Sequence, residues 1–84
     1  MKIYAIFKYP ENGYDCDVKA AKDAGLVVDK KYELHDASVG SFHTDIYLEG
    51  IGGSFNSVQF EFVDEFGNEV NIYKMPEFST YARW

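Results

Sequence analysis

The segment that most constrains the fold is residues 42–62, FHTDIYLEGIGGSFNSVQFEF. Apolar and polar residues alternate here on both sides of a glycine-rich stretch. The alternating apolar residues are Ile46, Leu48, Val58, Phe60 and Phe62. A period of two places one set of side chains on one face of a strand and the other set on the opposite face. The pattern therefore predicts two strands with one apolar face, which the rest of the chain must cover.

The connection between these strands, residues 49–53, contains three glycines. Glycine reaches positive φ without a steric clash, so we expect a tight or bulged turn here. A slip of one residue would move Phe60 and Phe62 into water, so the register should be firm. The glycines do not form a phosphate-binding loop, because Phe55 stands where G-x-G-x-x-G requires glycine and a strand follows instead of a helix.

Three more strands are predicted elsewhere in the chain. In residues 1–8 the apolar residues occupy both faces, which is typical of a strand that is central or covered on both sides. Those residues are Ile3, Ala5 and Phe7 on one face, and Tyr4 and Ile6 on the other. Residues 31–38 and 69–73 are also predicted as strands. Their inward residues are expected to be Tyr32, Leu34, Val70 and Ile72.

One helix is predicted within residues 15–24, with its regular part at about residues 16–24. Asp17 or Asp15 can accept hydrogen bonds from the free N–H groups of the first turn. Gly25 stands where a left-handed cap is expected. Helices this short are not stable alone in water, so the helix must dock on the sheet. The expected contact residues are Val18 and Ala21.

The segment Gly25 to Leu34, GLVVDKKYEL, resembles the opening segment of SH3-like small barrels, with Asp29 where that pattern often has glycine. More broadly, HTDIYL, SFNSVQFEF and KYEL resemble segments of small proteins from Firmicutes and their phages. The second resemblance implies an origin in a mobile element and no particular activity.

About five short strands and one short helix predict a mainly β fold. We expect either a small SH3-like barrel or a curved antiparallel sheet, in a single domain that spans residues 1–84. Closing the sheet would remove exposed strand edges, which otherwise invite aggregation.

The charge of the chain limits its partners. The formal net charge is −6, and residues 43–84 carry two basic side chains against seven carboxylates. Nucleic-acid binding depends mostly on neutralising phosphates with Lys and Arg, so duplex DNA is an unsuitable partner, and so are anionic membranes. A basic protein surface would be attracted. Acidic residues also keep a small protein soluble, and this simpler interpretation stays open.

Acidic and aromatic residues together are typical of a protein interface, where Tyr and Trp often supply much of the binding energy. The candidate partner-binding residues are Asp45, Tyr47, Glu49, Glu61, Asp64, Glu65, Glu69 and Trp84. We therefore predict a non-enzymatic protein-binding module. With the phage resemblance, this suggests an inhibitor that occupies the basic groove of a host nucleic-acid enzyme, by analogy of charge and size with small acidic inhibitors of CRISPR nucleases.

No catalytic, metal or cofactor site is expected. No serine lies in a nucleophile-elbow motif. Cys16 lies between Asp15 and Asp17, and neighbouring carboxylates disfavour the reactive thiolate; a small apolar role is expected instead. The two histidines, His35 and His43, lack the spacing of a metal-binding motif.

The expected location is cytoplasmic. A single cysteine excludes an intrachain disulfide framework. The apolar run near the N-terminus is too short for a signal peptide, and no stretch approaches the ~20 apolar residues of a membrane span.

Two other kinds of function remain open. The tyrosines could stack on bases or a small ligand, which would require a concave aromatic cluster with basic neighbours. The candidate basic neighbours are Lys2, Lys8, Lys30 and Lys31. Alternatively, an exposed strand edge could make the protein an oligomeric structural component.

Overall fold

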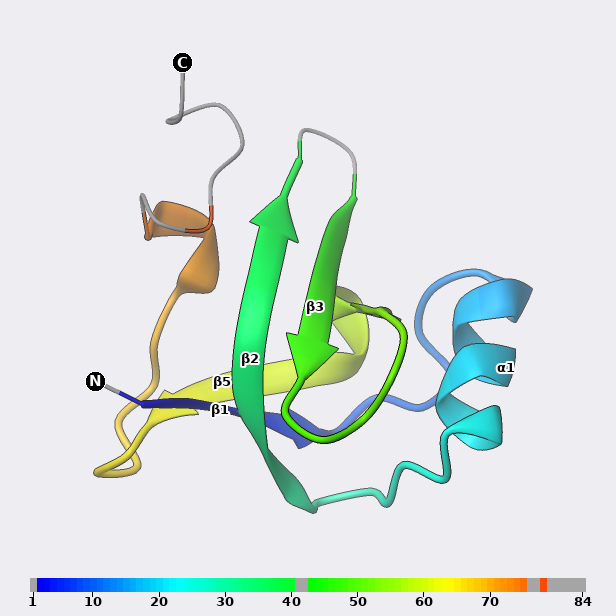
Figure 1. Cartoon of the computed structure of the whole chain (residues 1–84), viewed down its shortest axis with the longest axis horizontal. Helices are drawn as coiled ribbons and strands as arrows, with labels where there is room; N and C mark the ends of the chain where they lie inside the picture. Colours follow the sequence, from blue (N-terminus) through cyan, green and yellow to red (C-terminus); the bar gives the residue numbers. More distant parts are fainter. Residues whose placement is uncertain (1, 41–42, 76–77, 79–84) are drawn as a thin grey trace.

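The computed structural model describes residues 2–40, 43–75 and 78, and these form a curled antiparallel sheet with one short helix (Figure 1). The elements in chain order are β1 (Ile3–Phe7), α1 (Asp15–Asp23), β2 (Lys31–Val39), β3 (Thr44–Leu48), β4 (Phe55–Asn56), a 3-10 turn η1 (Ser57–Gln59), β5 (Phe60–Asp64) and a second 3-10 turn η2 (Ile72–Lys74). The predicted mainly β fold class is confirmed.

The sheet has the strand order β4-β3-β2-β1-β5, and every pairing is antiparallel. The long strand β2 belongs to both halves: Tyr32 pairs with Ala5 of β1, and Ala37 pairs with Ile46 of β3. A register shift lies between Leu34 and Asp36. Irregularities of this kind bend a strand and increase its twist. As a result β2 and β3 cross over β1 and β5 (Figure 1), and the sheet forms a half-barrel with β4 and β5 at its edges.

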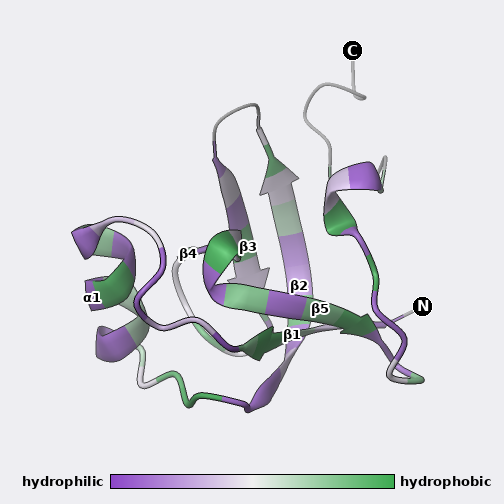
Figure 2. Cartoon of the chain, turned by 180° about the vertical axis from the view of Figure 1, so that it is seen from behind, coloured by the Kyte–Doolittle hydropathy of each residue, from purple (hydrophilic) through white to green (hydrophobic). Residues whose placement is uncertain are grey.

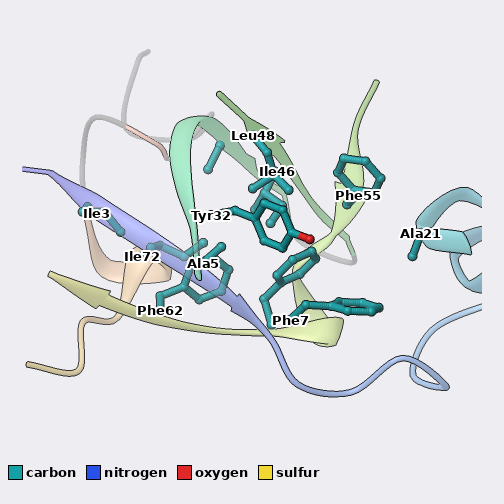
Figure 3. Close-up of a cluster of buried hydrophobic side chains, with 12 residues drawn as sticks. Ile3, Ala5, Phe7, Ala21, Tyr32, Ile46, Leu48, Phe55, Phe62 and Ile72 are labelled. Carbon is teal, nitrogen blue, oxygen red and sulfur yellow. The ribbon is translucent and has the colours of Figure 1, made fainter. Parts of the chain in front are cut away.

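The core lies between the two halves of the half-barrel, where the inward faces of the strands meet (Figure 3). Phe60 makes ring contacts with Phe7 and Phe55, with centroids 5.4 and 6.4 Å apart. Aromatic pairs at such distances add to the stabilisation from burial. Ile3, Ala5 and Phe7 of β1 are all buried, as their alternation predicts, and β5 carries alternating apolar and polar bands (Figure 2).

The strong hairpin expected from residues 42–62 is divided in the structure. Only Phe55 and Asn56 pair with β3; the chain then turns through η1, and β5 pairs with β1 instead. The Asn56 side chain accepts a hydrogen bond from the backbone N–H of Val58, which favours the turn. Val58 was predicted to lie in the core but is 45% exposed, because the turn rotates it away from the strand. Phe60 and Phe62 are buried as predicted.

The helix forms where it was predicted, and it ends at Asp23. The Asp17 carboxylate accepts from the N–H of Tyr14 at 2.9 Å, which satisfies a free donor at the start of the helix. After the last turn Gly25 has φ 72°, and the N–H of Leu26 bonds to the carbonyl of Ala21. This pattern of a left-handed glycine and a long return bond is a common helix stop. Ala21 is buried against the core, as expected.

The strand predicted at residues 69–73 is reduced to a single bridge between Glu69 and Val63. The Asn71 side chain accepts from the N–H of Tyr73 at 3.0 Å and begins η2, so the segment coils instead of extending the sheet. The expected inward residues are nevertheless correct. Ile72 is fully buried, and Val70 is half-buried against the core.

Candidate functional site

One surface gathers several of the predicted partner-binding residues. On the outer side of β2 and β3, which is turned towards the viewer in Figure 1, Asp36 lies opposite Tyr47 and Ser38 lies opposite Asp45. At the lower end of the same pair the N–H of Glu49 bonds to the carbonyl of Glu33. We call this surface the acidic face; it consists of Glu33, Asp36, Asp45, Tyr47 and Glu49. Two of its residues, Glu33 and Asp36, were not among the predicted set.

Ion pairs neutralise only part of the acidic face. Lys2 contacts Glu33 at 3.1 Å, and this hydrogen bond raises the pKa of Lys2 above its usual value. Each of the two histidines approaches a different carboxylate: His35 Nδ1 lies 2.9 Å from Glu49, and His43 Nε2 lies 2.7 Å from Asp45. Four carboxylates share this surface with these two histidines and one paired lysine. Surface ion pairs of this kind contribute little to stability, so the main effect of the face is its electric field.

The other predicted acidic residues lie elsewhere. Glu61 is on β5, and Glu65 and Glu69 follow that strand. In the sheet order β2 and β1 separate β5 from β3, so these residues are not on the β2–β3 surface, although Glu65 is near enough to Lys2 to help raise its pKa. The hydroxyl of Tyr9 donates to Glu61 at 2.9 Å, and this bond raises the pKa of Tyr9. Trp84 lies outside the described residues.

Asp64, one of the candidate partner-binding residues, has a structural role in the turn after β5. It is only 8% exposed, and one carboxylate oxygen accepts from the N–H groups of Phe66 and Asn68, each at 2.9 Å. The backbone bond from Asn68 is the main reason that the pKa of Asp64 is lowered. The carboxylate therefore shapes the turn after β5 and is largely shielded from solvent.

A second candidate site is an open hollow of about 700 Å³. The segments that line it can be followed in Figure 2: the loop before α1, the ends of β2 and β3, the turn η1 before β5, and η2. Among the described residues it is lined by Asn12, Gly13, Tyr14, Gly40, His43, Thr44, Asn56, Ser57, Val58 and Tyr73. These residues come from four segments far apart in the chain, so no local sequence pattern indicated the hollow.

The hollow has a polar floor and a partly aromatic rim. Thr44, Asn56 and Ser57 are buried, whereas Tyr14 is 74% exposed and Tyr73 is 47% exposed. The hydroxyls of Ser57 and Tyr73 lie 2.8 Å apart, which leaves most of their lone pairs able to accept hydrogen bonds. Binding sites commonly combine aromatic walls with a few polar groups in this way.

The basic residues expected beside an aromatic cluster lie elsewhere. Lys8 pairs with Asp29 at 2.8 Å, and Lys2 pairs with Glu33. The ammonium groups of Lys30 and Lys31 lie over the rings of Tyr32 and Tyr4, at 5.2 and 5.5 Å from their centroids. None of these four lysines lines the hollow. The described lining of the hollow therefore has no lysine beside its tyrosines, and such basic neighbours are what single-strand nucleic-acid binding would require.

Three further features were considered in the described part of the chain: a metal site, a membrane-spanning helix and the environment of Cys16. Across residues 2–40, 43–75 and 78, no three His, Cys, Asp or Glu side chains come close enough together to hold a metal ion. In the same ranges no helix has the length and apolar character needed to cross a membrane. Cys16, expected to pack as a small apolar residue, is exposed on α1.

The chain was compared with known protein families, and one family model matches it. A family model described as Bacteriophage T4 protein Y07B matches residues 2–83, which include both the acidic face and the hollow. The chain belongs to this phage protein family. This confirms the phage part of the resemblance seen in the sequence, while the relation to Firmicutes proteins stays a prediction. No curated protein and no solved structure matches the chain.

Proposed function

We propose that this phage protein is a non-enzymatic binding module that recognises a basic protein surface through its acidic face. The observation that carries the proposal is the placement of four carboxylates around Tyr47, which is 37% exposed on the outer side of β3. Clustered charge of one sign speeds association with an oppositely charged surface. A half-exposed tyrosine at the centre supplies contact area, which charge alone does not.

The class of partner follows from this charge. Host enzymes that act on nucleic acids carry basic grooves for the phosphate backbone, and an acidic sheet surface is electrostatically complementary to such a groove. We propose that the protein inhibits one of these enzymes by occupying its groove. Membership of a phage family supports a target in the host.

A pair of charge-reversal variants tests the acidic face. Asp36→Lys with Glu49→Lys changes the face, whereas Glu61→Lys with Glu69→Lys makes the same change in net charge on and after β5. Tagged wild-type protein and both variants are incubated with host lysate, and the retained proteins are identified by mass spectrometry at low and high salt.

We expect the wild-type protein and the β5-side variant to retain basic nucleic-acid enzymes, and the acidic-face variant to lose them. Retention should weaken at high salt, because exposed charges are screened. If the acidic-face variant retained the same enzymes as the wild type, recognition through this face would be wrong. Equal losses in both variants would show that only the net charge matters.

A further inference from the structure

The hollow is influenced by a negative charge that its own lining residues do not carry. One oxygen of Asp17 accepts from the backbone N–H of Tyr14 at 2.9 Å and from the side-chain amide of Asn56 at 3.0 Å. A Cβ atom added to Gly13 would lie only 2.8 Å from the same oxygen. Three lining residues are thus packed directly against one carboxylate, which places a negative charge behind this wall of the hollow.

A second carboxylate, Asp45, lies next to the lining residues His43 and Asn56. His43 lines the hollow, and its Nε2 is 2.7 Å from Asp45, a member of the acidic face. The described lining contains no Lys or Arg, and Lys74 follows Tyr73 in η2 without lining the hollow. The start of α1 is also nearby, but Asp15 and Asp17 in its first turn offset the partial positive charge of the helix end. The hollow therefore favours a cation over an anion.

The rim and floor suit a planar cation in particular. Tyr14 and Tyr73 offer exposed rings on which a guanidinium can stack. The Ser57 and Tyr73 hydroxyls offer acceptors for its several N–H donors. We propose that the hollow binds an arginine side chain of the basic partner, next to the acidic face and joined to it through the His43–Asp45 pair. The identity of the partner rests on the proposed function; the arginine site itself does not.

The site can be tested without the partner, using the peptide acetyl-Gly-Arg-Gly-amide as the probe. Its titration into ¹⁵N-labelled full-length protein is followed by NMR. The same peptide with citrulline in place of arginine is the matched control, because citrulline keeps the shape and removes the charge. We expect the arginine peptide to shift the signals of Gly13, Tyr14, His43 and Tyr73, and the citrulline peptide to bind at least about fivefold more weakly.

Protein variants separate the contribution of ring stacking to binding from that of negative charge. Tyr14→Ala removes an exposed ring, and Asp45→Asn removes one charge; each should weaken arginine binding about fivefold or more. Phe66→Ala and Glu65→Gln are the matched controls, since both residues are exposed in the turn after β5. Circular dichroism of each variant verifies that the fold is kept. The two controls should bind the peptide as the wild type does.

Three results would overturn the inference: no shifts at the lining residues, equal binding of the citrulline peptide, or equal binding by the Tyr14→Ala variant. Shifts confined to the acidic face would reject the hollow but leave the proposed function standing. Conversely, arginine binding in the hollow combined with unchanged capture by the acidic-face variant would reject the proposed function alone.

Discussion

The side-chain amide of Asn56 donates a hydrogen bond of 3.0 Å to the carboxylate of Asp17, and so joins the turn before β5 to the first turn of α1. The two residues are 39 positions apart in the chain. Asn56 is buried, and its side-chain oxygen also accepts from the N–H of Val58. One amide therefore begins the 3-10 turn, anchors the helix and forms part of the floor of the hollow.

Replacing Asn56 with Ala should destabilise the protein by about 1.5–3 kcal/mol, because the hydrogen bond to a charged group is lost and the Val58 N–H loses its partner. The measurement is urea unfolding followed by circular dichroism. Asn12→Ala is the matched control. The Asn12 amide contacts the same turn, donating to the carbonyl of Val58 at 3.1 Å, but it is exposed. A cost for Asn56→Ala no larger than that of Asn12→Ala would contradict the anchoring role.

Val58 and Phe60 should respond very differently to truncation, although the sequence pattern places both in the core. Val58→Ala should change the free energy of unfolding by no more than about 0.5 kcal/mol, since Val58 is exposed. Phe60→Ala should cost about 3–5 kcal/mol, because it leaves a cavity beside Phe7 and Phe55. Chemical denaturation of both variants measures the difference. Similar losses would mean that residues 57–60 form a continuous strand.

Acid should lower the stability of the folded protein, in part because Asp64 becomes protonated. The pKa of Asp64 is lower in the folded state than its usual value of 3.8, because it accepts backbone hydrogen bonds. A lowered pKa contributes stability above the unfolded pKa, and this contribution is lost as the pH falls through the folded pKa. Asp64→Asn should therefore lower Tm at pH 7, and the difference from the wild type should shrink as the pH falls below about 4.

Thermal unfolding monitored by circular dichroism between pH 2 and 7 tests this dependence. Glu65→Gln, a neighbouring exposed position, should leave Tm almost unchanged at pH 7. A constant difference in Tm between the wild type and Asp64→Asn over the whole range would show that the charge of Asp64 is unimportant.

The pKa of Tyr9 should depend on the contact of its hydroxyl with Glu61. The hydrogen bond to Glu61 raises the pKa of Tyr9 above its usual value of 10.0. The stabilisation is therefore present below about pH 10 and is lost as the pH rises through the folded pKa. Glu61→Gln should return the Tyr9 pKa towards the usual value, as measured by NMR titration of ¹³Cζ-labelled tyrosine. Glu69→Gln, a change beyond β5, should leave it unaltered; an unchanged pKa in Glu61→Gln would contradict the contact.

The sequence by itself determined the features that depend on neighbouring residues. Alternation identified the inward residues of β1 and of the first half of β2, but not Ala37 and Val39, which follow the register shift in β2. The helix was found from good helix formers followed by Gly25. The segment that resembles SH3-like barrels placed Asp29 where glycine is common. Asp29 has a positive φ of 68°, the conformation that glycine adopts most easily. Local sterics and side-chain direction control all of these features.

Only the tertiary structure decided which segments pair. Phe60 and Phe62 face inward whether their strand pairs with β3 or with β1, so their periodicity cannot distinguish the two arrangements. The choice depends on the turn that Asn56 begins and on burial against β1, and both depend on contacts distant in sequence. Pairing in turn decided the candidate sites. It brought Asp36 beside Tyr47 and Glu33 beside Glu49, fixed the Asp64 carboxylate in the turn after β5, and assembled the hollow from four separate segments.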